Sequence, residues 1–325
     1  MNISKKSDKK RRNWGEIPSK LPSGIIDTHA HIDMISDWVD DINQNNLKKN
    51  RQPIDNPTIQ TIARNSLKSN VINFIQCACD LPKINQLSNT LDSIEEVINL
   101  PLGAVAIHPN EAALHDGWSD TSPDGLIPVM GEIHKTNNLE SALAAVVEKL
   151  ENDKRIRVVG ETGLDFYRTA ASGWPAQIKS FREHISLAKN YNKALQIHDR
   201  LAHKEILEIL QADTPPERVI FHSFSGDSAM AEFCTKKGWF LSYSGPITFS
   251  NNEKSQKALK STDLNYLLLE TDCPFLAPAP NRGTPNAPVY TANIAYFIAE
   301  FLNLNLDQFC QKTLSNTFKV LDINI

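Results

Sequence analysis

Residues 176–198 read AQIKSFREHISLAKNYNKALQIH and contain the two patterns that decide the fold. In the first part, Ile178, Phe181 and Ile185 recur every three or four residues, which is the spacing of one apolar face on a helix. In the second part, the short apolar run Ala194–His198 is typical of a strand that is buried on both faces. A helix followed directly by such a strand is the building unit of a parallel α/β sheet.

The same alternation of strand and helix patterns begins at Gly24 and continues along the chain. Eight repeats favour a single closed (β/α)₈ TIM barrel over an open doubly wound sheet. No Gly-x-Gly-x-x-Gly follows a predicted strand, and no Gly-x-x-x-x-Gly-Lys-Ser/Thr loop occurs, which argues against a nucleotide-binding fold. The predicted strands are Ile25–Asp27, Val71–Cys77, Gly103–Ile107, Arg157–Glu161, Ala194–His198, Arg218–His222, Trp239–Tyr243 and Tyr266–Thr271. The predicted helices span 176–190, 203–211, 228–237, 253–261, 291–302 and 306–321.

Composition places the chain among ordinary globular proteins. It has 325 residues, of which 41% are hydrophobic and 22% charged, so collagen-like and disordered classes are excluded. No apolar run approaches the roughly 20 residues that span a bilayer, so we expect no membrane insertion. The five cysteines form no repeated spacing, and no secretory signal precedes the body of the chain. We therefore expect reduced thiols, a cytoplasmic location and a monomer.

Charge is distributed unevenly. Residues 1–20 carry seven basic and two acidic side chains, so the remainder is more acidic than the net charge of −4 suggests. We expect residues 1–22 to form a basic tail without regular structure and residues 23–325 to form the barrel. An acidic barrel that acts on a polyanion needs a local cationic pocket or bound metal ions.

Two segments depart from the regular pattern. Residues 33–65 are polar and rich in asparagine, and we expect an enlarged loop with one helix. Residues 273–290 contain five prolines, which prevents a regular helix or sheet. On a barrel, this second segment would border the active site, because it follows the last strand.

Metal-ligating side chains cluster where the predicted strands end. His29 and His31 lie two residues apart, so in an extended backbone both side chains point to the same side. A barrel brings the carboxyl ends of all its strands to one face, which predicts a metal centre there rather than separate histidines that each cap a strand. The other side chains at strand ends are His108, Glu161, His198, His222 and Asp272.

The number of ligands indicates two divalent ions. A catalytic zinc site uses about three protein ligands, and this set is larger. Two ions that share one carboxylate and one water can use all of these ligands. Glu161, which lies on a central strand, is the natural bridging carboxylate. Asp272 is the candidate general base, although a helix N-cap is the alternative role for it. Mg²⁺, Mn²⁺ and Zn²⁺ all remain possible.

The sequence motifs that contain these side chains resemble those of the TatD-type metal-dependent deoxyribonucleases. The resemblance extends from Gly24 to Phe318 of this chain. The resemblance implies a two-metal hydrolase that cleaves DNA phosphodiester bonds as a 3′–5′ exonuclease on single strands or 3′ ends. The family's His-Pro-His block is His108-Pro109-Asn110 here. The metal ligands carried over by the resemblance are His29, His31, Glu161, His198, His222 and Asp272. The motifs that carry it are residues 27–33, 106–109, 160–168, 197–200, 222–226 and 270–278, with Arg282-Gly283.

The candidate substrate groups are His108, Arg200 and Arg282, which lie beside the metal motifs and could contact phosphate. Arg168 and Lys204 are weaker candidates. Tyr167 could stack on a base, whereas Phe166 is expected in the core and Cys273 in the barrel wall.

A second reading keeps the barrel and the ions but changes the bond, to an ester, lactone or amide, including the ester of an aminoacyl-tRNA. Related amidohydrolases bridge their metals with a carbamylated lysine on the fourth strand, so Glu161 favours the nuclease. A non-catalytic metal-binding protein is the third reading, and the complete ligand set disfavours it.

Overall fold

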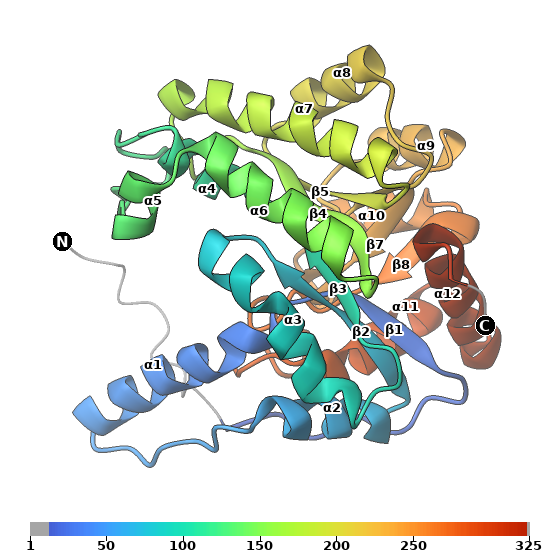
Figure 1. Ribbon diagram of the computed structural model, residues 1–325. Coiled ribbons are helices and arrows are strands. Elements are labelled where there is room, and N and C mark those ends of the chain that lie inside the picture. The colour runs from blue at the N-terminus through green and yellow to red at the C-terminus, as the bar shows by residue number, and fades with distance from the viewer. Residues whose placement is uncertain (1–12, 324–325) are drawn as a thin grey trace.

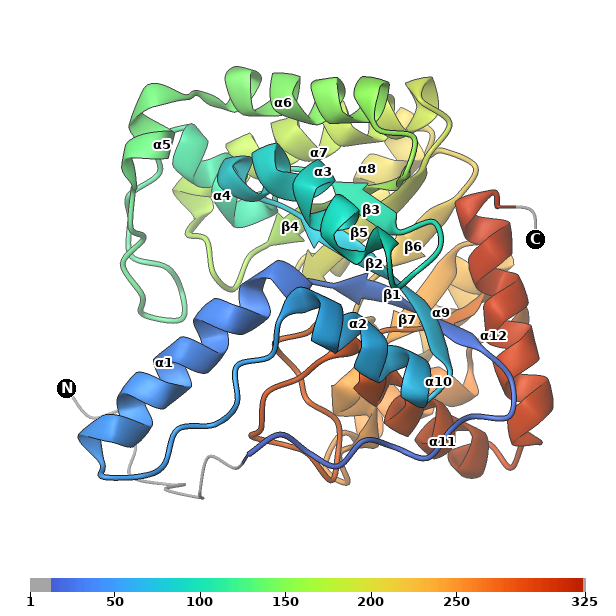
Figure 2. The ribbon, with the colours of Figure 1, turned by 60° about the horizontal axis from the view of Figure 1, so that its bottom comes forward.

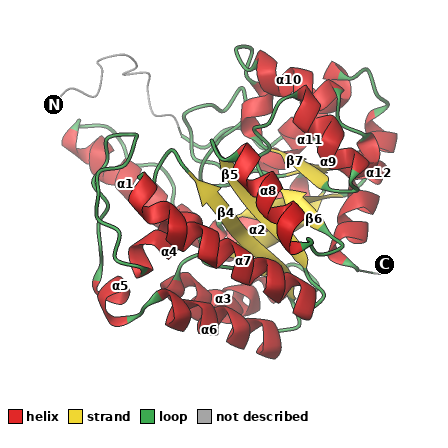
Figure 3. Cartoon of the chain, turned by 90° about the horizontal axis from the view of Figure 1, so that it is seen from above, coloured by secondary structure: helices red, strands yellow, loops and turns green. Residues whose placement is uncertain are grey.

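The computed structural model describes residues 13–323. Eight parallel strands are hydrogen-bonded in the order of the sequence, β1 to β8, and helices surround them (Figures 1 and 3). The strands are β1 (Ile25–Ala30), β2 (Val71–Ala78), β3 (Leu102–Val105), β4 (Ile156–Asp165), β5 (Ala194–Arg200), β6 (Val219–Phe221), β7 (Phe240–Tyr243) and β8 (Leu267–Leu269). The helices are α1 (Ile35–Lys48), α2 (Ile59–Lys68), α3 (Leu81–Glu95), α4 (Pro109–His115), α5 (Glu132–Thr136), α6 (Leu139–Asn152), α7 (Trp174–Asn190), α8 (His203–Asp213), α9 (Ser228–Lys236), α10 (Glu253–Lys260), α11 (Thr291–Phe301) and α12 (Leu306–Leu321).

The segment after β8 returns to β1 and closes the sheet. The Asp272 amide donates to the His29 carbonyl at 2.9 Å, and the His31 amide donates to the Cys273 carbonyl at 2.8 Å. Ala30 and Cys273 form a parallel bridge between these segments. The predicted (β/α)₈ barrel is therefore confirmed, with all eight predicted strands and all six predicted helices present.

Some predicted bounds were wrong. The polar segment 33–65 contains the predicted helix but is more helical than predicted, because α1 buries Ile35, Val39 and Ile42 along one face and α2 begins at Ile59. Glu161 and His198 do not end their strands, since β4 continues to Asp165 and β5 to Arg200. The predicted eighth strand is shorter, and β8 ends at Leu269. No regular helix interrupts residues 273–287, as the prolines predict.

Inside the barrel, alternate residues of β5 change from apolar to metal-ligating towards the carboxyl end of the strand. On β5, Ala194 belongs to a buried apolar cluster, Gln196 is buried above it, and His198 lies at the top. Leu268 on β8 and Glu270, one residue beyond the end of β8, follow a similar order from apolar to buried polar. Since side chains two residues apart share a face of a strand, the apolar floor supports a buried polar layer, and that layer supports the site.

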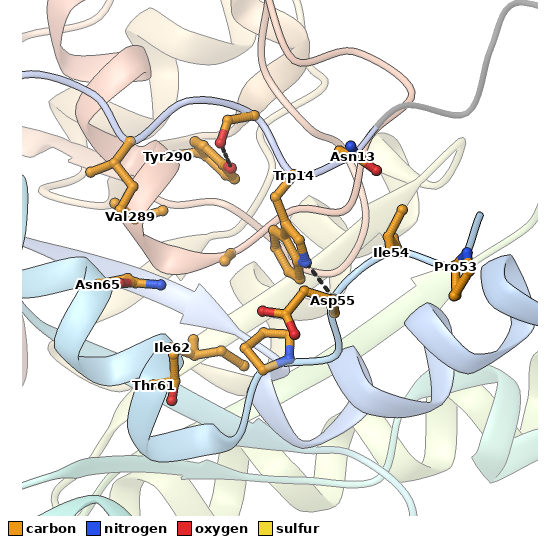
Figure 4. Close-up of a pocket in the computed structure, with 14 residues that line it drawn as sticks. Asn13, Trp14, Pro53, Ile54, Asp55, Thr61, Ile62, Asn65, Val289 and Tyr290 are labelled. Atoms are coloured by element: carbon orange, nitrogen blue, oxygen red, sulfur yellow. Dashed lines mark hydrogen bonds between the residues drawn. The ribbon is translucent and has the colours of Figure 1, made fainter.

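The segment before β1 packs against the outside of the barrel. The Trp14 indole donates to the Asp55 carbonyl at 2.8 Å, and the Tyr290 hydroxyl donates to the Gly15 carbonyl at 2.8 Å. A pocket of about 460 Å³ lies between this segment, α2 and residues 287–290 (Figure 4). The part of the predicted basic tail in residues 1–12 lies outside the described residues. Among the helices of residues 13–323, none is both long and apolar enough to cross a membrane.

Candidate metal centre

The six predicted metal ligands meet at the carboxyl ends of the strands, around the carboxylate of Glu161. We name two groups of ligands by the Glu161 oxygen that they face. The first subsite comprises His29, His31, Asp272 and Oε1 of Glu161, and the second subsite comprises His198, His222 and Oε2 of Glu161.

In the first subsite, four ligand atoms surround one point. The Nε2 atoms of His29 and His31 lie 3.6 and 3.5 Å from Oε1 of Glu161. The same two nitrogens lie 3.7 and 3.8 Å from Oδ1 of Asp272. Asp272 is the most accessible of the four, with 15% of its side chain exposed. Its φ of 55° is left-handed, and the closing hydrogen bond from its amide to the His29 carbonyl fixes the turn.

The hydrogen bonds of the two imidazoles show that a cation fits between them. Nδ1 of His29 lies 2.9 Å from the amide oxygen of Gln196, and Nδ1 of His31 lies 3.1 Å from the Cys77 carbonyl. Because both Nδ1 atoms donate, both Nε2 atoms, which face each other at 3.0 Å, would carry lone pairs if both rings were neutral. Without a metal ion, a proton on His31 lies between them, in agreement with the raised pKa of this ring. Two lone pairs at this distance repel each other unless a positive charge lies between them. The donor set therefore suits a metal ion.

In the second subsite, the two imidazoles are held by carboxylates. Nε2 of His198 lies 3.1 Å from Asp165, which leaves Nδ1 facing Oε2 of Glu161 at 3.0 Å. Nδ1 of His222 lies 3.2 Å from Glu270, which leaves Nε2 facing the same Glu161 oxygen at 2.8 Å. A carboxylate on the far nitrogen fixes the tautomer of a ligating histidine and raises its basicity.

The sequence analysis did not assign Asp165 or Glu270. Both lie within motifs that it quoted, Gly-Leu-Asp and Glu-Thr-Asp. Asp165 ends β4, which also carries Glu161, and Glu270 follows β8, two residues before Asp272. Gly163 brings the β4 and β5 backbones close enough for this arrangement. A Cβ on Gly163 would lie 2.1 Å from the His198 carbonyl oxygen, and its φ of 138° disfavours any other residue.

The site is strongly negative apart from its histidines. No lysine or arginine within residues 13–323 forms an ion pair with Glu161, Glu270 or Asp272. Burial lowers the pKa of His31 and His198, but hydrogen bonds to and charges of the nearby carboxylates outweigh it, and both pKa values are about 9. Buried carboxylates that hold protons on their neighbouring histidines attract a cation.

Glu161 and Asp272 differ in their proton affinity. Burial raises the pKa of Glu161, but the charges of His222 and the other histidines outweigh it, so the pKa lies well below its usual range. Burial raises the pKa of Asp272. Glu161 is thus suited to remain a carboxylate that contacts both subsites, and Asp272 is suited to accept a proton.

His108 approaches the second subsite and, in the tautomer that the structure shows, presents an N–H donor to it rather than a lone pair. Its Nδ1 accepts a hydrogen bond from the Asn110 amide at 3.1 Å, so its proton lies on Nε2, 4.0 Å from Oε2 of Glu161. Burial lowers the pKa of His108 to about 3, which keeps the ring neutral. It presents a donor to the site, as expected for a substrate-binding group. Asn110, which replaces the second histidine of the family motif, accepts from the Thr169 hydroxyl.

The two predicted substrate arginines each lie over an aromatic ring. The guanidinium of Arg200 lies 4.5 Å from the centre of the Tyr167 ring, and that of Arg282 lies 4.4 Å from the centre of Phe249. Neither forms an ion pair with another residue in 13–323.

The weaker substrate candidates are arranged differently. Arg168 lies 4.0 Å from Asp124, and Lys204 lies 3.7 Å from Glu208. Phe166 was expected in the core but is half-buried, and it stacks on Trp174 at the edge of the core. Cys273 is fully buried, as expected.

Comparison with known proteins identifies the family to which the chain belongs. The family described as TatD related DNase matches residues 26–322. A metal-dependent hydrolase named TatD from Mycobacterium tuberculosis is 28% identical over 302 residues, which cover 90% of this chain and 96% of that protein. The metal-dependent hydrolase YabD of Bacillus subtilis is 36% identical over 182 residues, or 55% of this chain and 71% of that protein. The structure of the Escherichia coli TatD homologue YjjV has a TM-score of 0.70 at 22% identity, covers 92% of this chain and 98% of its own, and supports the fold. This chain therefore belongs to the TatD related DNase family.

Proposed function

We propose that this protein is a metal-dependent hydrolase that cleaves DNA phosphodiester bonds, with one divalent cation at each subsite. One observation carries the proposal. The two oxygens of Glu161 face separate sets of imidazoles, with His29 and His31 on Oε1 and His198 and His222 on Oε2. A carboxylate in this position is the expected bridge of a two-metal site.

The chain's own residues divide the work of hydrolysis. Two bound cations supply an acidified shared water and neutralise charge on a phosphate oxygen. Asp272 accepts a proton from the attacking water, because burial raises its pKa and its side chain remains accessible at the edge of the first subsite. Glu161 keeps its charge throughout, because its pKa is low. The Nε2–H of His108 donates to a non-bridging phosphate oxygen.

Arg200 and Arg282 support an anionic substrate. Both are cations that form no ion pair with a carboxylate in residues 13–323. A phosphate can therefore bind either guanidinium without displacing a carboxylate. Tyr167 is 36% exposed beneath Arg200 and offers a ring on which a base can stack. Single-stranded DNA and 3′ ends suit stacking on such rings, and we propose 3′–5′ exonuclease activity on them.

We also propose that the protein acts as a cytoplasmic monomer. All five cysteines are free and buried, which suits a reducing compartment.

The test of the proposed function uses metal-stripped protein and 5′-labelled single-stranded DNA, with Mg²⁺, Mn²⁺ or Zn²⁺ added separately. We expect a metal-dependent ladder of products that Asp272→Asn abolishes and that the matched surface change Asp263→Asn leaves intact. A ladder that shortens from the 3′ end supports the polarity. If two ions bind per chain and no ion supports cleavage, the nuclease proposal is wrong, and ester, lactone and aminoacyl-tRNA substrates become the candidates.

A further inference from the structure

A second group of potential metal ligands lies outside the centre described above, in the connection between β3 and β4. We propose that Glu111, His115 and His134 form a Zn²⁺ site, which we call the α4–α5 site. Figure 2 shows α4 and α5 beside each other at one edge of the barrel. The site shares no residue with either subsite, and the argument for it does not depend on the proposed nuclease activity.

The three side chains converge from two short helices. Glu111 and His115 lie four residues apart on α4, and such residues share a helix face. His134 comes from α5, with Nε2 2.9 Å from Oε2 of Glu111. The rings of His115 and His134 have centres 4.8 Å apart. One ligand atom from each residue lies within 4.8 Å of the others, so small side-chain shifts bring all three onto one ion.

His115 supplies the independent evidence for a ligand. The residue is only 4% exposed, and its Nδ1 donates to the Asn137 carbonyl at 2.7 Å. Nε2 therefore carries the lone pair, and within residues 13–323 this buried atom has no hydrogen-bond partner. A buried acceptor without a partner costs free energy, which native proteins rarely tolerate without a reason. The nitrogen is already in the form that binds metal, and it belongs to a group that can hold an ion.

The donor atoms select the ion. Two imidazole nitrogens and one carboxylate oxygen are a common three-ligand set for Zn²⁺, whereas Mg²⁺ and Ca²⁺ prefer oxygen ligands alone. The Glu111 side chain is 26% exposed, so water can reach a fourth coordination position.

Binding requires one rearrangement, and its cost is small. Nδ1 of His134 accepts a hydrogen bond from the Gly131 amide at 3.0 Å, so its ring proton lies on Nε2. To ligate through Nε2, the neutral ring keeps one proton but moves it to Nδ1. The Gly131 amide then turns to solvent, which it can reach because Gly131 is only half-buried. The amide exchanges this hydrogen bond for one to water and is not left without a partner.

The ion would fix part of the active-site rim. It would tie α5 to α4, whose N-cap is His108, the donor that faces Glu161. The connection between the two helices also carries Asp124, which lies 4.0 Å from Arg168 beside the site.

The test compares the zinc content of full-length variants that have been stripped of metal and dialysed against buffered free Zn²⁺. We expect Glu111→Gln and His115→Gln each to bind one Zn²⁺ fewer per chain than the wild type. Glu132→Gln is the matched control, because Glu132 lies on α5 with an exposed side chain, and we expect it to bind as much zinc as the wild type. Glu111→Gln changes a partly exposed residue, so it gives an answer even if the buried His115→Gln fails to fold.

A Glu161→Gln variant separates this proposal from the catalytic one. The Glu161→Gln change disturbs both subsites of the metal centre. This variant should still bind one Zn²⁺ at the α4–α5 site, which is the ion that Glu111→Gln loses. Equal zinc content in the wild type, Glu111→Gln and folded His115→Gln would overturn the α4–α5 site and leave the proposed function untouched.

Discussion

Replacing Glu270 by Gln tests the role of this carboxylate in the second subsite, because it contacts the His222 nitrogen that faces away from Glu161. Oε1 of Glu270 lies 3.2 Å from Nδ1 of His222 and accepts from the Ser223 amide at 2.6 Å. A glutamine oxygen can accept both hydrogen bonds, so Glu270→Gln removes the charge and keeps the geometry. The first subsite has no such charge behind its rings, since His29 and His31 donate to an amide oxygen and a backbone carbonyl.

The expected loss of metal affinity follows from this difference between the two subsites. Groups that orient metal ligands typically contribute 10- to 100-fold to metal affinity. Glu270→Gln loses the charge alone, so we expect about a tenfold loss at the second subsite, or about 1.4 kcal/mol. Glu270→Leu also loses the hydrogen bonds and should lose about 100-fold, or about 2.7 kcal/mol. The affinity of the first subsite should change much less in both variants.

Calorimetric titration of metal-stripped protein with Mn²⁺ measures the two affinities separately. Glu232→Gln, on the exposed surface of α9, is the matched control and should bind as the wild type does. If Glu270→Gln leaves both affinities unchanged, or lowers both equally, our assignment of this carboxylate to His222 and the second subsite is wrong.

Three further predictions follow from the same geometry. His31 and His198 have pKa values of about 9 without metal, so metal binding at pH 7.5 should release protons, and the metal affinity should increase as the pH rises from 6 to 9. Titrations in buffers of different ionisation enthalpy measure the number of protons released, and an absence of proton release would contradict this prediction. Arg200→Ala should raise KM for DNA about tenfold with little change in kcat and weaken its salt dependence, whereas a fall in kcat alone would argue against a phosphate contact. Gly163→Ala should lower the melting temperature and the metal content together, because the added Cβ meets the His198 carbonyl, and unchanged values of both would refute the close β4–β5 approach.

The convergence of these side chains on one face could be predicted from the sequence, because it follows from local rules. Apolar runs indicated the strands, and a parallel barrel places every strand end on one face, so His29, Glu161 and His222 could be assigned to one site without coordinates. The division of the ligands between two oxygens of Glu161 could not be predicted, because it depends on the register shift between β4 and β5.

Other features depend on packing that no short pattern records. We expected the Asn-rich segment after β1 to be a loop with one helix, because polar residues outnumber apolar ones along it; one of them, Asn46, is buried in α1. Asp165 contacts a ring on the neighbouring strand β5, and Glu270 contacts a ring that follows β6, two strands away, so their roles appear only once the barrel is assembled. His134 reaches α4 across a long irregular connection, and no spacing rule connects it with His115.

The central claim is that Glu161 holds two ions between two pairs of histidines. Anomalous diffraction from crystals of the Mn²⁺-loaded protein tests it most directly, because it locates each ion. We predict two peaks that flank the Glu161 carboxylate, one in contact with His29 and His31 and the other with His198 and His222. A single peak at this face of the barrel, or two peaks of which only one contacts Glu161, would contradict the account.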